Sequence, residues 1–387
     1  MRDILEGLKV IDVDTHALEP PDLWTSRISP TWGDAIPRVV PDPVTGLPRW
    51  KVADVLLTGV ATHSAAGWGD WYPSRPPTFE EADPGSWDPK ERLKRMDEYG
   101  VYTQILYPNQ IGFHIHAFMR LDPALRLQCV QAYNDYQAEF CATDPKRLVA
   151  LVYPPFWDLD ESIKEIERCT ATGYFKGVNW GTRFERLGFQ PFRDEHWDPL
   201  YALAQEIGHP LNFHIGFNQQ TVEETSLISV RDRLESAKFS GLLFAGNIEG
   251  IAEVIFSGVC DRFPSLNFVS VESGYGYVPF LLQMLDWQFA NYGQKRYYPT
   301  MLKPSEYFRR QIYATFWFEE LAVSIDQYPD NVMFESDYPH GTSLSPGPAS
   351  EALTAADTLR KNLDTVPQDI INKIVQDNAV RVYNLDI

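Results

Sequence analysis

The stretch LKVIDVDTH, residues 8–16, is an apolar run that ends in two polar side chains, Asp14 and His16. A short run of this kind, rich in β-branched residues, predicts a buried β-strand. Residues two apart on a strand point to the same side, so both side chains would leave the strand end together. Because carboxylate and imidazole groups bind metals, the pair predicts part of a metal site.

Three later strand-like runs end in similar groups, namely His214, Glu272 and Asp337. Polar residues at the ends of several parallel strands are how a barrel enzyme builds its active site. We therefore expect Asp14, His16, His214 and Asp337 to bind a divalent ion, with Glu272 in or next to this ligand set. The mixture of nitrogen and oxygen donors suits Zn²⁺, Mn²⁺ or Fe²⁺. Such an ion lowers the pKa of a bound water or polarises a substrate oxygen.

Strand-like and helix-like segments alternate about eight times along the chain. Eight such units with short buried strands favour a (β/α)8 TIM barrel over a doubly wound sheet. We expect strands over residues 8–14, 102–107, 148–153, 175–180, 211–215, 266–272, 311–317 and 332–336. We expect helices over residues 89–99, 122–142, 197–207, 241–262, 277–291 and 318–327, one more that begins near 160, and a helical tail over 350–383.

The alternation breaks once, over residues 19–88, which is far longer than an ordinary connection between a strand and a helix. This segment is rich in Pro, Gly and Trp, and residues 38–52 are typical of a hairpin that turns at Thr45-Gly46. We treat residues 1–387 as a single barrel domain and 19–88 as an insert after the first strand. The insert leaves from the catalytic end of that strand, so we expect either a lid over the site or a dimerisation element.

Composition excludes several classes of function. The formal net charge of −19 argues against nucleic acid, which requires a basic face. The four cysteines form no C-x-x-C pair, and we expect them to be reduced core residues. The sequence has no apolar run of about 18 residues and no signal peptide near its first residue. We therefore expect a cytoplasmic protein that acts on a small molecule, with no membrane partner, and that forms a homo-oligomer such as a dimer.

The motifs DVDTH (12–16), FHIG (213–216), ESGYGYVPF (272–280) and SDYPH (336–340) occur in this order along the chain. Together with the closing segment IVQDNAVRVY (374–383), they resemble the amidohydrolase superfamily. The similarity is to its amidohydrolase-related branch, which includes aminocarboxymuconate semialdehyde decarboxylase and metal-dependent benzoate-type decarboxylases. The resemblance implies a distorted barrel and a divalent metal at the strand ends.

Two positions depart from the pattern of that branch. The first motif usually reads His-x-His or Glu-x-His, whereas this chain has Asp14-x-His16. The decarboxylases are expected to carry an acid/base histidine at the end of the sixth strand, whereas this chain has Glu272. Glu272 could act as a base, bind the metal, or bridge two ions. One ion is the main expectation, and two ions are the alternative.

Further residues near the expected strand ends are candidates for contact with substrate. His114 and His116 follow the second strand, and His340 follows Asp337. Trp180 and Tyr275 lie at strand ends, where aromatic side chains would suit a ring-containing substrate. In the loop after the fourth strand, Arg183 and Arg186 could bind a substrate carboxylate.

These residues support more than one reaction. We expect a non-oxidative decarboxylase or a hydrolase of a small, ring-containing organic acid, with Asp337, Glu272 and His214 as catalytic groups. The alternative is a dinuclear non-haem iron oxygenase that uses the same site, with Glu272 as a bridging ligand. Metal content and O₂ uptake distinguish the two hypotheses.

Overall fold

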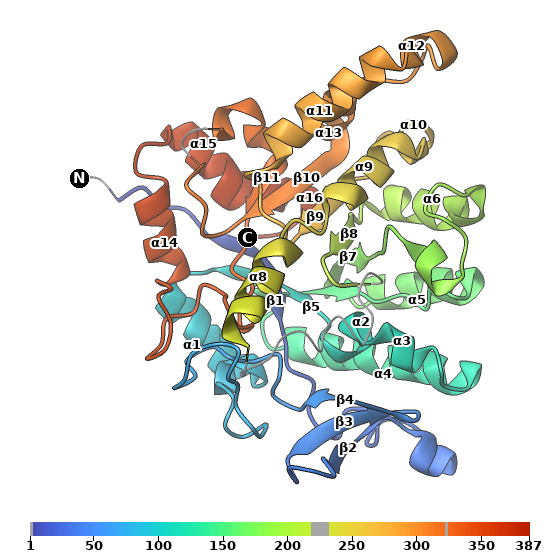
Figure 1. Ribbon diagram of the computed structural model, residues 1–387, viewed down its shortest axis with the longest axis vertical. Helices are drawn as coiled ribbons and strands as arrows, with labels where there is room; N and C mark the ends of the chain where they lie inside the picture. Colours follow the sequence, from blue (N-terminus) through green and yellow to red (C-terminus); the bar gives the residue numbers. More distant parts are fainter. Residues whose placement is uncertain (1–2, 218–231, 322–323) are drawn as a thin grey trace.

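The computed structural model describes residues 3–217, 232–321 and 324–387. Its main feature is a sheet of eight parallel strands with helices around it, in the order β1-β5-β6-β7-β8-β9-β10-β11 (Figure 1). This arrangement confirms the predicted (β/α)8 barrel. The strands are β1 Ile11–His16, β5 Thr103–Tyr107, β6 Leu148–Val152, β7 Phe175–Asn179, β8 Leu211–His214, β9 Phe268–Val271, β10 Ile312–Phe316 and β11 Val332–Phe334.

The helices begin and end where local sequence signals place them. Asp88 caps the first helix by accepting hydrogen bonds from the backbone of Lys90 and Glu91, and Gly100 ends it in the left-handed conformation at φ 75°. The helices are α1 Pro89–Tyr99, α2 Gln110–Phe113, α3 Ile115–Phe118, α4 Pro123–Cys141, α5 Leu159–Thr170, α6 Asp198–Ile207, α8 Arg233–Leu243, α9 Ile248–Phe256, α10 Val259–Arg262, α11 Val278–Asn291, α12 Gln294–Tyr297, α13 Pro304–Gln311, α14 Ala355–Asn362, α15 Gln368–Asn372 and α16 Asn378–Tyr383.

The barrel closes between its first and last strands through the loop that follows β11. The backbone N–H of His16 donates to the carbonyl of Tyr338 at 2.8 Å, and that of Asp337 donates to the carbonyl of Asp14 at 3.0 Å. These bonds set the two sequence motifs side by side, although more than 300 residues separate them along the chain.

The C-terminal tail packs against the interior of the barrel. Val382 and Tyr383 of α16 belong to one buried cluster with strand residues such as Ile11 and Val269. The Tyr383 hydroxyl donates to Oδ1 of Asn212 at 2.6 Å. The tail thus fixes the barrel interior beneath the strand ends that carry the polar groups.

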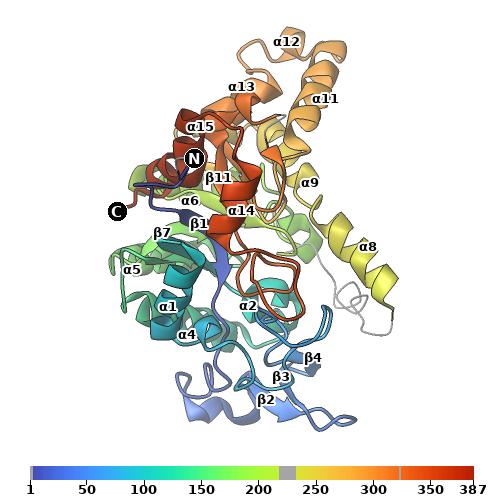
Figure 2. The ribbon, with the colours of Figure 1, turned by 90° about the vertical axis from the view of Figure 1, so that its left-hand side faces the viewer.

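The insert after β1 contains a three-stranded antiparallel sheet that lies to one side of the barrel (Figure 2). Its strands are β2 Arg38–Pro41, β3 Pro48–Val52 and β4 Val55–Gly59. Pairing of β2 with β3 around Gly46, at φ 74°, confirms the predicted hairpin. Trp24 anchors the segment to the barrel. Its ring centroid lies 5.0 Å from that of Trp50, and its Nε1 donates a hydrogen bond to the carbonyl of Cys129 on α4.

Two predicted helices differ from the structure. The segment 241–262 contains the end of α8, then α9 and α10. A turn at 244–247 separates α8 from α9, and Gly258, at a φ of 78°, separates α9 from α10. The helix expected at 318–327 is wrong for the part that the structure describes, which has a 3-10 turn at Ile325–Gln327, while residues 322–323 lie outside the description. There the Glu319 carboxylate accepts backbone bonds from Trp317 and Tyr275, which ties this segment to the turn after β9.

Among the described residues, one helical stretch, Arg233–Phe256, has the length and apolar composition of a membrane span. A turn at 244–247 divides it into α8, of 11 residues, and α9, of 9 residues. A spanning helix needs about 20 residues. This stretch is therefore weak evidence for a membrane-spanning segment.

Candidate active site

The strand ends bring five ionisable side chains into one buried cluster. Asp14 and His16 come from β1, and His214 comes from β8. Glu272 directly follows β9, and Asp337 lies three residues after the end of β11. None of the five is more than 7% exposed. The structure thus brings together all the residues that the sequence suggested as metal ligands.

The backbone at two of these positions has an unusual conformation. Glu272 and Asp337 have positive φ angles, 55° and 58°, although neither is glycine. Such conformations cost about 1–3 kcal/mol each and gather at functional sites. The barrel framework must stabilise them, because the backbone of Asp337 is bonded to β1 and that of Glu272 donates to Oε2 of Glu335 at 3.0 Å.

The donor atoms of the cluster converge on one point. Nε2 of His16 lies 3.2 Å from Nε2 of His214 and 3.6 Å from an oxygen of each of Asp14 and Asp337. Nε2 of His214 lies 3.5 Å from Asp14 and 3.3 Å from Glu272. These atoms form three overlapping groups, each with ligand atoms within 4.8 Å of one another: Asp14, His16 and His214; His16, Asp337 and His340; and Asp14, Glu272 and Asp337.

Unpartnered oxygens in the cluster fit a bound cation. Both carboxylate oxygens of Asp14, and Oδ2 of Asp337, are buried and have no hydrogen-bond donor among the described residues. A buried carboxylate without a donor is costly, and a metal ion is one of the few groups that offsets the cost. His214 also has the geometry of a ligand, because its Nδ1 lies 2.6 Å from the carbonyl of Ile215 and its Nε2 is left to face the cluster.

Electrostatics support the same interpretation. Burial raises the pKa of Glu272 to about 8. Burial also raises the pKa of Asp337 well above its usual range, and the neighbouring carboxylates add to this effect. Burial and the nearby imidazoles lower the pKa of His16, so this residue is neutral, which is the form that binds metals. A cation would reverse the shifts of the acids, because an opposite charge favours the ionised carboxylate.

A second set of contacts holds the ligands in place. Asp12 accepts hydrogen bonds from the backbone of Ser336 at 2.9 Å and from the amide of Gln104 at 3.3 Å. The guanidinium of buried Arg92 donates to Oε1 of Gln104 and to the carbonyl of His16. This network connects β1 to the loop after β11, so it fixes both halves of the ligand set.

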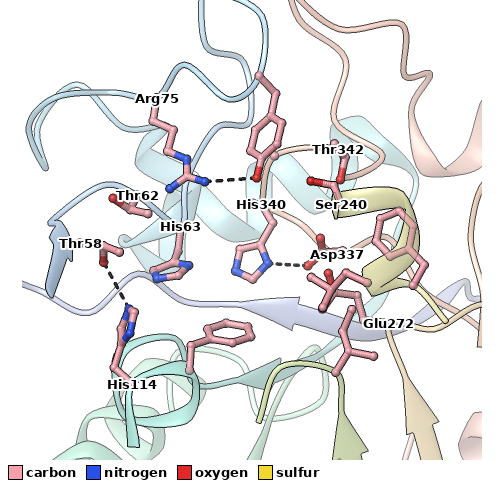
Figure 3. A pocket seen from close by; sticks show the side chains of 16 residues that line it. Thr58, Thr62, His63, Arg75, His114, Ser240, Glu272, Asp337, His340 and Thr342 are labelled. Atoms are coloured by element: carbon pink, nitrogen blue, oxygen red, sulfur yellow. Dashed lines mark hydrogen bonds and ion pairs between the residues drawn. The ribbon is translucent and has the colours of Figure 1, made fainter. Parts of the chain in front are cut away.

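A cavity of about 120 Å³ lies next to the cluster (Figure 3). Glu272, Asp337 and His340 border it on the barrel side. Its other residues include aromatic and aliphatic side chains, such as Phe113 and Phe244. The insert contributes Thr58, Thr62, His63, Tyr72 and Arg75 to the lining.

The residues predicted to contact substrate fall into two groups. His340 and His114 line the cavity, and Nδ1 of His340 lies 2.8 Å from Asp337 while its Nε2 lies 2.8 Å from Oδ1 of Asn109. The cavity lining does not include His116, Trp180 or Tyr275.

Their surroundings explain where the latter two side chains point. Trp180 packs in the core against Phe184 and Trp197, with ring centroids 4.6 and 5.2 Å apart. Tyr275 is fully buried and donates its hydroxyl to the carbonyl of Ser324. The geometry therefore gives no support for a substrate contact by either residue.

Arg183 and Arg186 also lie away from the cavity lining, and both lie within ion-pair distance of Glu249. The cavity lining also includes Arg75 and His63, which are not among the candidate residues named from the sequence. Both lie in the Pro- and Gly-rich insert, which has no strand or helix periodicity around these positions. The one signal available was that the insert leaves β1 next to the ligands.

Comparison with known families supports the resemblance seen in the sequence. A family model described as Amidohydrolase matches residues 11–385. A 2-amino-3-carboxymuconate-6-semialdehyde decarboxylase of Dictyostelium discoideum is 24% identical over 297 residues, which cover 74% of this chain and 76% of the relative. A gamma-resorcylate decarboxylase of Rhizobium radiobacter is 24% identical over 323 residues, covering 76% and 86% of the two chains.

Solved structures share the fold. An amidohydrolase from Mycobacterium avium subsp. paratuberculosis aligns with a TM-score of 0.75 at 20% identity, covering 97% of this chain and 99% of its own. A dihydroxybenzoic acid decarboxylase from Polaromonas, solved with manganese and the inhibitor 2-nitroresorcinol, aligns with a TM-score of 0.62 at 18% identity and covers 97% of each chain.

Proposed function

Because the chain belongs to the amidohydrolase family, we propose that it is a metal-dependent, non-oxidative decarboxylase of a small aromatic carboxylic acid. The observation that carries the proposal is the convergence of Asp14, His16, His214 and Asp337, with unpartnered buried oxygens, beside a cavity of about 120 Å³. For comparison, an engineered apolar cavity of roughly 150 Å³ holds one benzene ring. The named relatives are decarboxylases, and the manganese in the Polaromonas structure supports a divalent ion here.

The reaction breaks one carbon–carbon bond, releases CO₂ and adds a proton to the ring carbon. A divalent ion held by the cluster would bind the substrate carboxylate and a neighbouring oxygen, and so fix the ring. Glu272 and Asp337 border the cavity, and either can pass to the ring carbon the proton that replaces the departing carboxylate. His340 lines the same wall, and its Nδ1 lies 2.8 Å from Oδ1 of Asp337, close enough to orient that carboxyl group.

Two other reactions were expected from the sequence. Hydrolysis of an ester, amide or lactone would use the same ligands, and the experiment below includes it as an outcome. The dinuclear iron oxygenase has no support from the described residues or from the relatives. We propose one ion, and its identity among Zn²⁺, Mn²⁺ and Fe²⁺ is left to metal analysis.

The test measures CO₂ release by the purified protein after reconstitution with Mn²⁺ or Zn²⁺. Substrates are 2,6-dihydroxybenzoate, 2-hydroxybenzoate and its ring-carboxylated derivatives, with aryl esters and lactones as the hydrolase panel. We expect metal-dependent CO₂ release that a chelator abolishes and that yields the ring with hydrogen in place of the carboxylate. Ester or lactone hydrolysis without CO₂ release from any acid would contradict the proposal.

A further inference from the structure

Arg75 is a cation that lines the cavity and has no acidic partner among the residues that the structure describes. Its Nη2 donates to the Tyr72 hydroxyl at 3.2 Å, and its Nε is buried with no acceptor. Over residues 3–217, 232–321 and 324–387, no carboxylate lies within 4.0 Å of its guanidinium. Arg49 in the insert and Arg95 in α1 are instead paired with Asp42 and Asp83, respectively.

The immediate surroundings of Arg75 do not balance its charge. Thr62 and His63 lie on the same side of the cavity, and burial lowers the pKa of His63, so this imidazole is neutral. In Figure 3, His340 lies between Arg75 and the carboxylates of Asp337 and Glu272. The cavity therefore has an acidic end, which fits a metal, and a separate cationic end supplied by the insert.

We propose that Arg75 binds a second anionic group of the substrate, a carboxylate on the ring, while the carboxylate to be lost lies at the metal end. This inference rests on the proposed function, and it narrows the substrate class to aromatic acids with two carboxylates. Arg75 is then a specificity-determining residue rather than a catalytic one.

Physical chemistry favours a carboxylate over a neutral group at this position. A guanidinium offers five N–H donors in a planar fork that matches the two oxygens of a carboxylate, and Tyr72 uses only one of them. A charge that is partly removed from water is stabilised most by an opposite charge with good hydrogen-bond geometry. The Tyr72 ring, with its centroid 5.4 Å from Cζ of Arg75, holds the guanidinium from one side.

The experiment compares binding of 2-hydroxybenzoate with binding of its four derivatives that carry one further carboxylate on the ring. Wild type, Arg75→Met and Arg75→Lys are each loaded with Mn²⁺, checked for metal content and folding, and titrated by calorimetry. We expect wild type to bind one of the diacids at least 10-fold more tightly than the monoacid. Arg75→Met should lower the affinity for that diacid about 10- to 100-fold, the range expected for loss of a charge-assisted contact. The same variant should change the affinity for the monoacid less than about 3-fold.

Arg38→Met is the matched control, because it removes the same charge from the insert at an arginine that pairs with Asp34 and lies outside the cavity lining. It should leave both affinities unchanged. Arg75→Lys should keep part of the preference for the diacid, since it keeps the charge but loses the planar fork. The inference would be overturned if Arg75→Met lowered the affinities for the monoacid and the diacid equally, or if wild type bound no diacid more tightly than the monoacid.

CO₂ release separates this inference from the proposed function. If wild type decarboxylates monoacids and Arg75→Met changes all acids alike, the subsite is wrong and the decarboxylase stands. If Arg75→Met selectively weakens diacid binding but wild type releases no CO₂ from any acid, the subsite stands and the decarboxylase is wrong.

Discussion

The two ends of the cavity differ in how their side chains are held. At the metal end, residues such as Asp14 and His214 lie on or next to barrel strands and are at most 1% exposed. At the other end, Thr58, His63 and Arg75 come from the insert and are half-buried. The difference teaches that the barrel fixes the reactive groups, while a separate segment selects what reaches them.

The attachment of the insert supports this division. The backbone of Ala65 and Ala66 donates to the carbonyl of Pro339, one residue from His340, at 2.9 and 3.1 Å. Arg233 of α8 donates to the carbonyls of Trp71 and Tyr72, each at 3.1 Å. These bonds join the insert to the loop after β11 and to α8, whereas the barrel strands are joined by continuous backbone pairing. That the insert acts as a lid, rather than as a fixed wall or a dimer contact, stays a proposal.

The largest effect is expected at the metal end. Replacing His16 or His214 with Ala should abolish metal binding and activity, because each removes a ligand from a buried set that water cannot replace. Metal analysis and CO₂ release measure the two losses. His196→Ala, at an exposed histidine, is the control and should keep both properties. Full metal occupancy in the two variants would show that the barrel end does not bind the ion.

Glu272→Gln should have the next largest effect, since it removes a charge and nearly keeps the shape. Loss of an acid/base group costs about 10²–10⁴ in rate, and loss of a ligand lowers metal affinity as well. The control is Glu319→Gln, which alters the same turn through the backbone of Tyr275 and Gly276 but lies outside the cavity lining. A Glu272→Gln variant with wild-type rate and metal content would mean that Glu272 is structural.

Metal affinity should depend on pH at this end. Burial holds the pKa of Glu272 near 8 in the metal-free protein, so below pH 8 the carboxyl keeps a proton that a cation must displace. We therefore expect affinity to rise from pH 6 to pH 8, by up to about tenfold per pH unit for each proton released. Calorimetry in buffers of different ionisation enthalpy counts these protons. Glu272→Gln should release fewer, and an unchanged slope in that variant would contradict the assignment.

The smallest effect is expected at the insert end, where Nε2 of His114 lies 3.4 Å from Thr58 of β4. Burial lowers the pKa of His114 from 6.5 to about 4, so between these values the unfolded chain binds a proton that the folded chain does not. The free energy of unfolding should therefore fall as pH drops through this window, by about 1 kcal/mol near pH 5.5. His114→Gln should reduce this loss. Denaturant unfolding at pH 7.5 and 5.5 tests it, and equal acid sensitivity in the two proteins would refute it.

Much of the barrel end could be predicted from the sequence because local rules are sufficient there. An apolar run fixes a strand, the alternation of side chains fixes which residues share a side, and parallel strands bring their ends to one rim. Asp14, His16 and His214 follow from these rules. The same rules fail at Trp180, the residue directly after β7, because nothing in the local sequence shows that its side chain packs in the core against Trp197.

The sequence by itself therefore determined the barrel, the order of its strands and the residues that converge at its mouth. Only the tertiary structure decided which end of the cavity is cationic, because Arg75 lies in a segment without strand or helix periodicity, so the sequence pattern does not place it. It also decided that Glu272 and Asp337 adopt positive φ angles. That conformation is unfavourable for an isolated chain and persists because the closed barrel fixes the backbone on both sides.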